Sequence, residues 1–218
     1  MNPEDFRASS MGQCVRTLQG YWAFVPYPLP PELELDWDLV RLLSEADRAL
    51  SELSGAGRLL PNPHLLIGPY MRREAVLSSR IENTQAGMSD LFFFEADETL
   101  PSGAPDVREV ANYMRAMDYG LARLRELPIS IRLVREIHQR LMEGVRGEHG
   151  TSGELRRSQN WIGPLGCTLN NATYVPPPVQ EMFDALGAWE KYLHANVMEP
   201  LLVQCALIHY QFEAIHPF

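Results

Sequence analysis

Apolar residues recur every three or four positions along most of the chain, the spacing that predicts helices with one buried face. The longest regular stripe lies in residues 107–124 and consists of Val107, Val110, Met114, Met117, Leu121 and Leu124. Similar stripes predict further helices over residues 37–53, 69–86, 131–141, 179–193 and 201–215. The pattern therefore predicts a mainly α fold, a bundle of surface helices around one core.

Local residues mark the ends of several of these helices. Ser130 is the expected N-cap of the helix that begins after it, because its hydroxyl can accept a hydrogen bond from an unpaired N–H of the first turn. Gly55 and Gly57 are expected to end the first helix, and Pro69 lies near the expected start of the second. The last helix is apolar on more than one face, so we expect it to be the buried central helix.

Two regions lack this spacing. Residues 1–36 are polar at first and then rich in proline and aromatic residues, which predicts an ordered arm or short strands. Residues 144–178 are rich in glycine and contain two short β-prone runs, at 161–162 and 173–175, before three prolines. They predict a small β-hairpin on the helical body.

Composition and charge exclude several classes of partner. A net charge of −9 without any cluster of Lys and Arg argues against binding to a nucleic acid. Three scattered cysteines, Cys14, Cys167 and Cys205, form neither a disulfide framework nor a metal site, so we expect a reduced, cytoplasmic setting. The N-terminus is not a secretory signal, and no apolar run reaches the ~20 residues that cross a membrane. We expect a soluble protein without a membrane partner.

The last helix delivers a histidine to the point where the helix must end. Pro217 follows His216 directly, so His216 should lie at the helix C-terminus beside a loop. The negative end of the helix dipole favours the imidazolium there, which must be offset if the ring is to act as a base near neutral pH. Such a histidine is more often packed or solvent-facing than catalytic, and this pattern leaves both interpretations open.

Resemblance to a known family changes that balance. The tripeptide 216–218, His-Pro-Phe, resembles the opening of the Fic signature H-P-F-x-D/E-G-N-G-R-x-x-R, of which three positions are present. Residues 78–83 resemble the family's inhibitory motif [S/T]-x-x-x-E-[G/N]. Further similarity to a core helix and to the segments that flank the family's flap lies in residues 108–113, 153–163 and 174–178. These ordered matches identify the chain as similar to Fic (Fido) proteins, which implies a helical bundle with a β-hairpin flap.

The resemblance implies a protein adenylyltransferase. In the family, a histidine at the position of His216 takes the proton from a Ser, Thr or Tyr hydroxyl of a target protein as it attacks the α-phosphate of ATP. The family's phosphate-binding Gly-Asn-Gly segment and its acidic Mg²⁺ ligand would follow Phe218. We therefore expect this chain to be a fragment or a truncated product that holds no metal ligand and is nearly inert by itself.

Self-inhibition is also implied by the resemblance. Ser78, Glu82 and Asn83 occupy the inhibitory motif, and residues four apart lie on one face of a helix. In the family, the matching glutamate reaches into the ATP site and pairs with the second arginine of the signature, so that the γ-phosphate cannot bind productively. That arginine would also follow Phe218. A solvated helix carboxylate is the alternative interpretation of Glu82.

The hairpin is a candidate docking element. Family members hold the target chain by strand addition to such a flap, and by position Thr173, Tyr174 and Val175 would form its edge. An ordinary surface hairpin is equally consistent with these residues.

We expect two regions and weigh three functions. Residues 1–105 would form an N-terminal arm and helical region that carries the inhibitory motif, and residues 106–218 an incomplete catalytic core. The first hypothesis is a self-inhibited enzyme that transfers AMP and can also remove it. The second is a catalytically inactive helical module that binds a partner through its flap or as a homodimer. The third is a transferase that uses another nucleotide or a phosphodiester donor.

Overall fold

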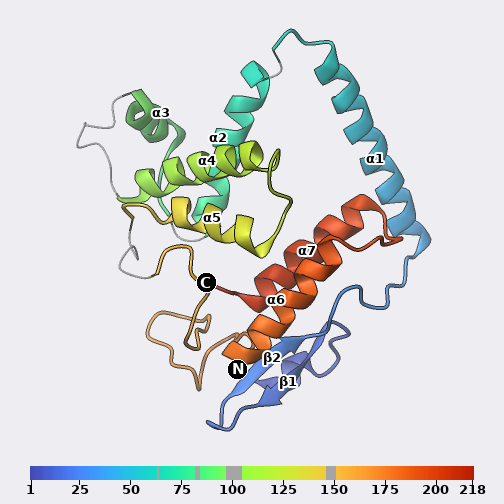
Figure 1. Cartoon of the computed structure of the whole chain (residues 1–218), viewed down its shortest axis with the longest axis vertical. Helices are drawn as coiled ribbons and strands as arrows, with labels where there is room; N and C mark the ends of the chain where they lie inside the picture. Colours follow the sequence, from blue (N-terminus) through green and yellow to red (C-terminus); the bar gives the residue numbers. More distant parts are fainter. Residues whose placement is uncertain (63, 82–83, 97–104, 146–150) are drawn as a thin grey trace. The chain divides into compact units, whose positions relative to one another are not determined.

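The structure, a computed structural model, describes residues 1–62, 64–81, 84–96, 105–145 and 151–218 (Figure 1). These residues form seven α-helices and a two-stranded sheet, which confirms the predicted mainly α fold. The elements in chain order are a 3₁₀ helix Pro3–Phe6, β1 (Gly12–Arg16), β2 (Trp22–Pro26), α1 (Trp37–Arg58), α2 (His64–Ile81), α3 (Met88–Ala96), α4 (Pro105–Arg123), α5 (Ile131–Leu141), α6 (Val179–Leu193) and α7 (Leu201–Ile215).

The chain divides into two compact units. Unit 1 contains residues 1–47 and 155–218, and unit 2 contains residues 48–154. The expected boundary after residue 105 falls inside unit 2, at the first turn of α4. The division into two functional regions stays a prediction. Among the described residues, none of the helices has both the length and the apolar character needed to span a membrane.

In unit 1, the N-terminal arm forms an antiparallel pair of strands, as expected. Cys14 in β1 lies opposite Phe24 in β2. The N–H of Phe24 points to the other edge of β2, where it donates to the carbonyl of Val175 at 2.8 Å. The hairpin predicted within residues 144–178 is confirmed in part. Ile162 and Tyr174 form an antiparallel bridge, with backbone hydrogen bonds from Ile162 to Tyr174 and from Thr173 and Tyr174 to Ile162, but no longer strand extends from it. The residue after the bridge, Val175, bonds through its carbonyl to the edge of β2, so the hairpin does not continue beyond Tyr174.

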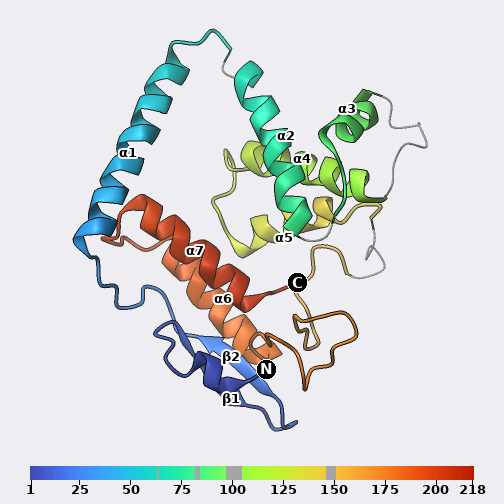
Figure 2. The same ribbon diagram turned by 180° about the vertical axis from the view of Figure 1, so that it is seen from behind.

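Helices α6 and α7 lie side by side against β2 (Figures 1 and 2). The indole N–H of Trp189 in α6 donates to the carbonyl of Ile208 in α7 at 3.0 Å, and its ring packs on Phe212 with centroids 5.4 Å apart. Only one face of α7 is buried, through Leu207, Gln211, Ala214 and Ile215, whereas Leu201, Cys205 and Tyr210 are exposed. The last helix was expected to be the buried central helix, and in the described residues it is buried on this one face.

In unit 2, α4 packs against α2, α3 and α5. The core of unit 2 consists of Ala75, Val76, Ala86, Leu91, Phe94, Val107, Val110, Ala111 and Met114. The N–H of Leu133 donates to the hydroxyl oxygen of Ser130 at 3.3 Å, which confirms Ser130 as the N-cap of α5.

Three helix boundaries differ from the sequence prediction. Helix α1 continues to Arg58 through Gly55 and Gly57, neither of which adopts a positive φ. An exposed helical glycine costs only about 1 kcal/mol, too little to end a long helix by itself. Helix α2 begins at His64, so Pro69 lies inside it, and it ends at Ile81. Helix α3 was not expected, because its apolar residues form a continuous run, 91–94, without helical spacing.

One carboxylate links α4 to α5. Glu136 accepts hydrogen bonds from the hydroxyl of Tyr119 at 2.7 Å and from the guanidinium groups of Arg123 at 3.1 Å and Arg132 at 2.9 Å. The bond from Tyr119, followed by those from Arg123 and Arg132, lowers the pKa of Glu136 from 4.5 to about 2.

Replacing this carboxylate should make stability depend less on pH. Because the folded-state pKa of Glu136 lies below its unfolded value, the ionised carboxylate stabilises the fold above about pH 4.5, and this contribution is lost as the pH falls toward about 2. Glu136→Gln should therefore be less stable than wild type at neutral pH, with the difference shrinking through that window in urea denaturation. Glu52→Gln, on the exposed surface of α1, is the control. A difference that stays constant with pH would contradict the assignment.

Candidate functional site at the end of α7

His216 lies at the C-terminus of α7 and adopts a left-handed backbone conformation, with φ 46° and ψ 67°. No other non-glycine residue in the described ranges has a positive φ. This conformation costs about 1–3 kcal/mol and persists only where the surroundings hold it. The N–H of His216 donates to the carbonyl of Phe212 at 3.0 Å and ends the helix, and Pro217 follows outside it. The expected location of His216 is confirmed, and its catalytic role stays a prediction.

The guanidinium of Arg156 holds the backbone on both sides of this turn. Its Nε donates to the carbonyl of His216 at 2.9 Å, and one of its terminal nitrogens donates to the carbonyl of Ile215 at 3.5 Å. The backbone N–H of Arg156 donates to the carbonyl of Pro217 at 2.9 Å. Arg156 therefore satisfies carbonyl groups that the left-handed turn removes from the helical hydrogen-bond pattern.

Asn160 completes the arrangement. Its side-chain amide donates to the carbonyl of His216 at 3.3 Å and to the backbone oxygen of Phe218 at 2.8 Å. Arg156 and Asn160, which we call the carbonyl clamp, thus bind four successive backbone oxygens, those of residues 215–218. The clamp supplies the contacts that can offset the cost of the His216 conformation.

Arg156 is a buried cation whose hydrogen-bond acceptors are all backbone carbonyls. It is 8% exposed, and besides the helix end it donates to the carbonyls of Ser158 at 3.3 Å and Pro177 at 2.5 Å. No carboxylate forms an ion pair with it in the part of the chain that the structure describes. Burial lowers the pKa of Arg156, but a guanidinium stays protonated in proteins. The full charge is therefore balanced by carbonyl dipoles at a helix C-terminus.

Tyr174 supports the last turn of α7 from another side. Its hydroxyl donates to the carbonyl of Ala214 at 2.6 Å. Its ring lies 6.0 Å from the ring of Phe24 and 6.0 Å from that of Phe6, measured between centroids. Burial raises the pKa of Tyr174, so its hydroxyl keeps its proton and remains a donor at neutral pH.

The three residues expected at a docking edge have different surroundings. Thr173 is exposed, and its N–H donates to the carbonyl of Ile162 at 2.8 Å. Tyr174 directs its hydroxyl to α7, and Val175 is fully buried with its carbonyl bonded to β2. Of the three, Thr173 is thus the one that presents its side chain to solvent. Strand addition at this edge stays a prediction.

The inhibitory motif is described only in part. Glu82 and Asn83 lie outside the described residues. Ser78, in the last turn of α2, donates its hydroxyl to the carboxylate of Glu74, which also accepts from the hydroxyl of Tyr113 in α4 at 2.9 Å. Burial, together with the contact to Glu74, raises the pKa of Tyr113 to about 12, so this hydroxyl also stays protonated. These contacts attach the end of α2 to α4.

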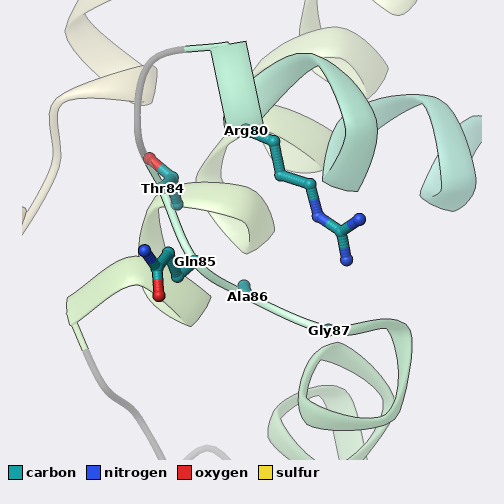
Figure 3. Close-up of a pocket in the computed structure, with 5 residues that line it drawn as sticks. All are labelled: Arg80, Thr84, Gln85, Ala86 and Gly87. Atoms are coloured by element: carbon teal, nitrogen blue, oxygen red, sulfur yellow. The ribbon is translucent and has the colours of Figure 1, made fainter.

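A pocket of about 500 Å³ lies directly after the motif, within unit 2. Figure 3 shows Arg80 extending from α2 beside the segment that supplies the other lining residues, Thr84, Gln85, Ala86 and Gly87. Carboxylates already occupy the polar groups of this segment. Thr84 donates to Glu109 at 2.9 Å, and the N–H groups of Gln85 and Gly87 donate to Asp106 at 2.6 Å and Asp90 at 2.9 Å. Three carboxylates therefore surround this segment, with the positively charged Arg80 beside it.

Sequence reasoning did not assign a role to Arg156 or Asn160. Both fall in the segment that resembles the family's flap region, but Arg156 is followed by Arg157, and nothing in the sequence separates the buried arginine from the exposed one. The segment has no helical or strand period that would predict which side chain points inward. The one available signal was the clustering of polar residues with many donors, Arg-Arg-Ser-Gln-Asn, directly before Trp161.

The fold has a relative among solved structures. A crystal structure of a Fic family protein from Desulfovibrio desulfuricans G20 is similar, with a TM-score of 0.66 and 20% sequence identity over 87% of this chain and 55% of that chain. At this identity the likeness shows the fold. The chain spans about half the length of the protein it matches.

Family models cover most of the chain. Residues 40–122 match the N-terminal model of the Fic/DOC family, and residues 128–218 match the Fic/DOC family model itself. Together with the fold, these matches show that the chain belongs to the Fic family, as the sequence motifs predicted.

The Tyr174 hydroxyl can be tested separately from the chemistry. Tyr174→Phe should destabilise the protein by about 1–3 kcal/mol, because the carbonyl of Ala214 loses its buried donor. The free energy of unfolding from urea denaturation measures this. Tyr27→Phe is the matched control, since Tyr27 is 44% exposed and its hydroxyl has no hydrogen bond recorded in the described part of unit 1. Equal stability of the two variants would show that the contact to α7 contributes little.

Proposed function

We propose that this protein transfers AMP from ATP to a Ser, Thr or Tyr hydroxyl of a target protein, with His216 as the general base. Membership of the Fic family supports a transferase of this general kind. The observation that carries the assignment of the base is the left-handed conformation of His216, held at a helix end by the carbonyl clamp. Backbone strain that the surroundings maintain is typical of functional sites.

In the proposed reaction, the oxygen of the target hydroxyl attacks the α-phosphorus of ATP while the imidazole of His216 takes the hydroxyl proton. A bond forms between that oxygen and the α-phosphorus. The bond from the α-phosphorus to the oxygen that bridges it to the β-phosphate breaks, and pyrophosphate leaves. The imidazolium then returns its proton to solvent. His216 must be neutral when the hydroxyl arrives.

Mg²⁺ would supply charge neutralisation on the phosphates of ATP. Among the residues that the structure describes, no group of three or more His, Cys, Asp or Glu side chains could hold a metal ion. No step of the transfer is therefore assigned to a metal ligand of this chain.

Glu82 is proposed to restrain the reaction by occupying the γ-phosphate position, as the family motif implies. The same site is also proposed to remove AMP from the modified target. The attachment of α2 to α4 through Glu74 and Tyr113 supports a defined position for the helix that leads into the motif.

The position of the radioactive label in ATP tests the proposal in the full-length gene product. ATP labelled at the α-phosphate should label protein, and ATP labelled at the γ-phosphate should not. His216→Ala should reduce labelling by about 10²- to 10⁴-fold, the usual contribution of a general base. His209→Ala, which removes an exposed histidine from the same helix, is the matched control and should retain labelling. Equal labelling by both forms of ATP would indicate a kinase and reject the proposal.

Release of the proposed inhibition is a separate prediction. Glu82→Gly should increase labelling from α-labelled ATP roughly tenfold, within the range of typical couplings between a regulatory and an active site. The double variant Glu82→Gly with His216→Ala should remain unlabelled, which ties the gain to the same base. If Glu82→Gly labels no more than wild type, inhibition by this residue is rejected while the transfer reaction itself still stands.

A further inference from the structure

The carbonyl groups at the end of α7 create an electrostatic problem for a base. The C-terminus of a helix carries about half a negative charge, which stabilises a protonated imidazole and raises its pKa. His216 is the C-cap residue of α7, so its ring is attached directly to this end. A general base must be unprotonated when the hydroxyl arrives. A positive charge near the negative end of the helix is therefore needed if His216 is to act as a base near neutral pH.

Arg156 places a full positive charge at the same carbonyl groups. Its guanidinium donates to the carbonyls of Ile215 and His216, the last helical residue and the C-cap. Because Arg156 is 8% exposed and has no ion pair among the described residues, neither solvent nor a nearby carboxylate screens its charge strongly. A cation in this position opposes the field of the helix end and disfavours a second cation on the neighbouring imidazole.

The geometry of Arg156 adds a second effect. A guanidinium presents several N–H groups in a rigid plane and can bind several carbonyls at once, as it does for His216, Ile215 and Pro177. A lysine ammonium is a compact charge without this fork. The side chain therefore offers two separable properties, its charge and its planar set of donors.

We propose that Arg156 is a positioning residue for His216: its planar donors hold the left-handed turn that aims the imidazole, and its buried charge offsets the helix C-terminus so that the imidazole is neutral. This inference rests on the proposed function for its catalytic meaning. The effect on His216 itself exists whether or not the chain transfers AMP.

The other ionisable groups around the end of α7 define what else acts on the imidazole. Helix α7 carries His209, Tyr210 and Glu213 within its last two turns, and the 155–178 segment contributes Arg157 and Tyr174 beside Arg156. Strand β2 has no ionisable side chain, and the first turn of α6 has one, that of Glu181. The acidic groups in this set would raise the pKa of His216. His209 and Arg157 are exposed to solvent, so Arg156 is the buried cation of the set that contacts the helix end and lowers the pKa.

Proton NMR titration of the His216 ring tests the charge without relying on activity. The His216 signal is assigned by its loss in His216→Ala, and its pKa is compared in wild type, Arg156→Gln and Arg156→Lys. Arg156→Gln removes the charge and should raise the pKa of His216 by roughly 0.5–1 unit, the scale of a helix-end interaction. Arg156→Lys keeps the charge and should leave the pKa close to wild type. Arg157→Gln removes the exposed neighbouring charge and should also leave it unchanged.

Kinetics of the full-length protein tests the positioning. Arg156→Lys should lower kcat for AMP transfer roughly 10- to 100-fold with little change in KM for ATP, because a displaced base affects the chemical step and not nucleotide binding. The pH at which kcat is half-maximal should stay at its wild-type value in Arg156→Lys and move upward in Arg156→Gln. Thermal denaturation of each variant establishes that it is folded. A purely structural role would lower the melting temperature without moving this pH.

The outcomes separate this inference from the proposed function. If wild type transfers no AMP but the His216 pKa rises in Arg156→Gln, the proposed function fails and the electrostatic inference stands. If wild type is active and Arg156→Gln leaves both the His216 pKa and the pH profile unchanged, the inference is overturned. If Arg156→Gln does not fold, a wild-type kcat in folded Arg156→Lys overturns the positioning role, and a lowered kcat at unchanged KM supports it.

Discussion

The backbone oxygens at the end of α7 need donors, and this requirement organises unit 1. The last carbonyls of a helix have no partner within it, and the left-handed turn at His216 adds further carbonyls that leave the helical pattern. The buried side chain of Arg156 donates to the carbonyls of Ile215 and His216, and its backbone N–H donates to that of Pro217. Because its charge is balanced by these dipoles, the guanidinium and the helix end depend on each other. Loss of either would leave buried polar groups without partners.

The position of His216 consequently depends on segments that are distant in sequence. Tyr174 bonds the last turn of α7 and packs on the aromatic residues of the N-terminal arm. The side chain of Gln211, one turn earlier in α7, donates to the carbonyl of Tyr27 at 3.0 Å. A general base has to lie within hydrogen-bond reach of its substrate, and packed elements maintain such a position better than an isolated loop. In this unit the N-terminal arm is therefore part of what supports the candidate site.

Contacts in unit 2 position the helix that leads into residues 78–83, the proposed inhibitory motif. Glu74 accepts from Ser78 within α2 and from Tyr113 in α4, so one carboxylate fixes both the end of α2 and its partner helix. Thr84 then donates to Glu109 in α4 immediately after the motif. The motif is thus bracketed by two attachments to α4. If the motif regulates the site as proposed, such anchors would give it the defined position that a defined effect on a site requires.

The sequence by itself determined the helical class, the family, the N-cap at Ser130 and the place of His216 at a helix end, because each depends on local spacing or on motif residues. Local signals failed where long-range contacts compete with them, as for Val175, whose carbonyl accepts from β2 and not from within the expected hairpin. Helix α3 was not predicted because its apolar residues form a continuous run without helical spacing. Tertiary structure alone decided that Arg156 is buried at the end of α7 whereas Arg157 is exposed. Two adjacent arginines are chemically identical in the sequence, and only the packing of residues about 60 positions apart distinguishes them.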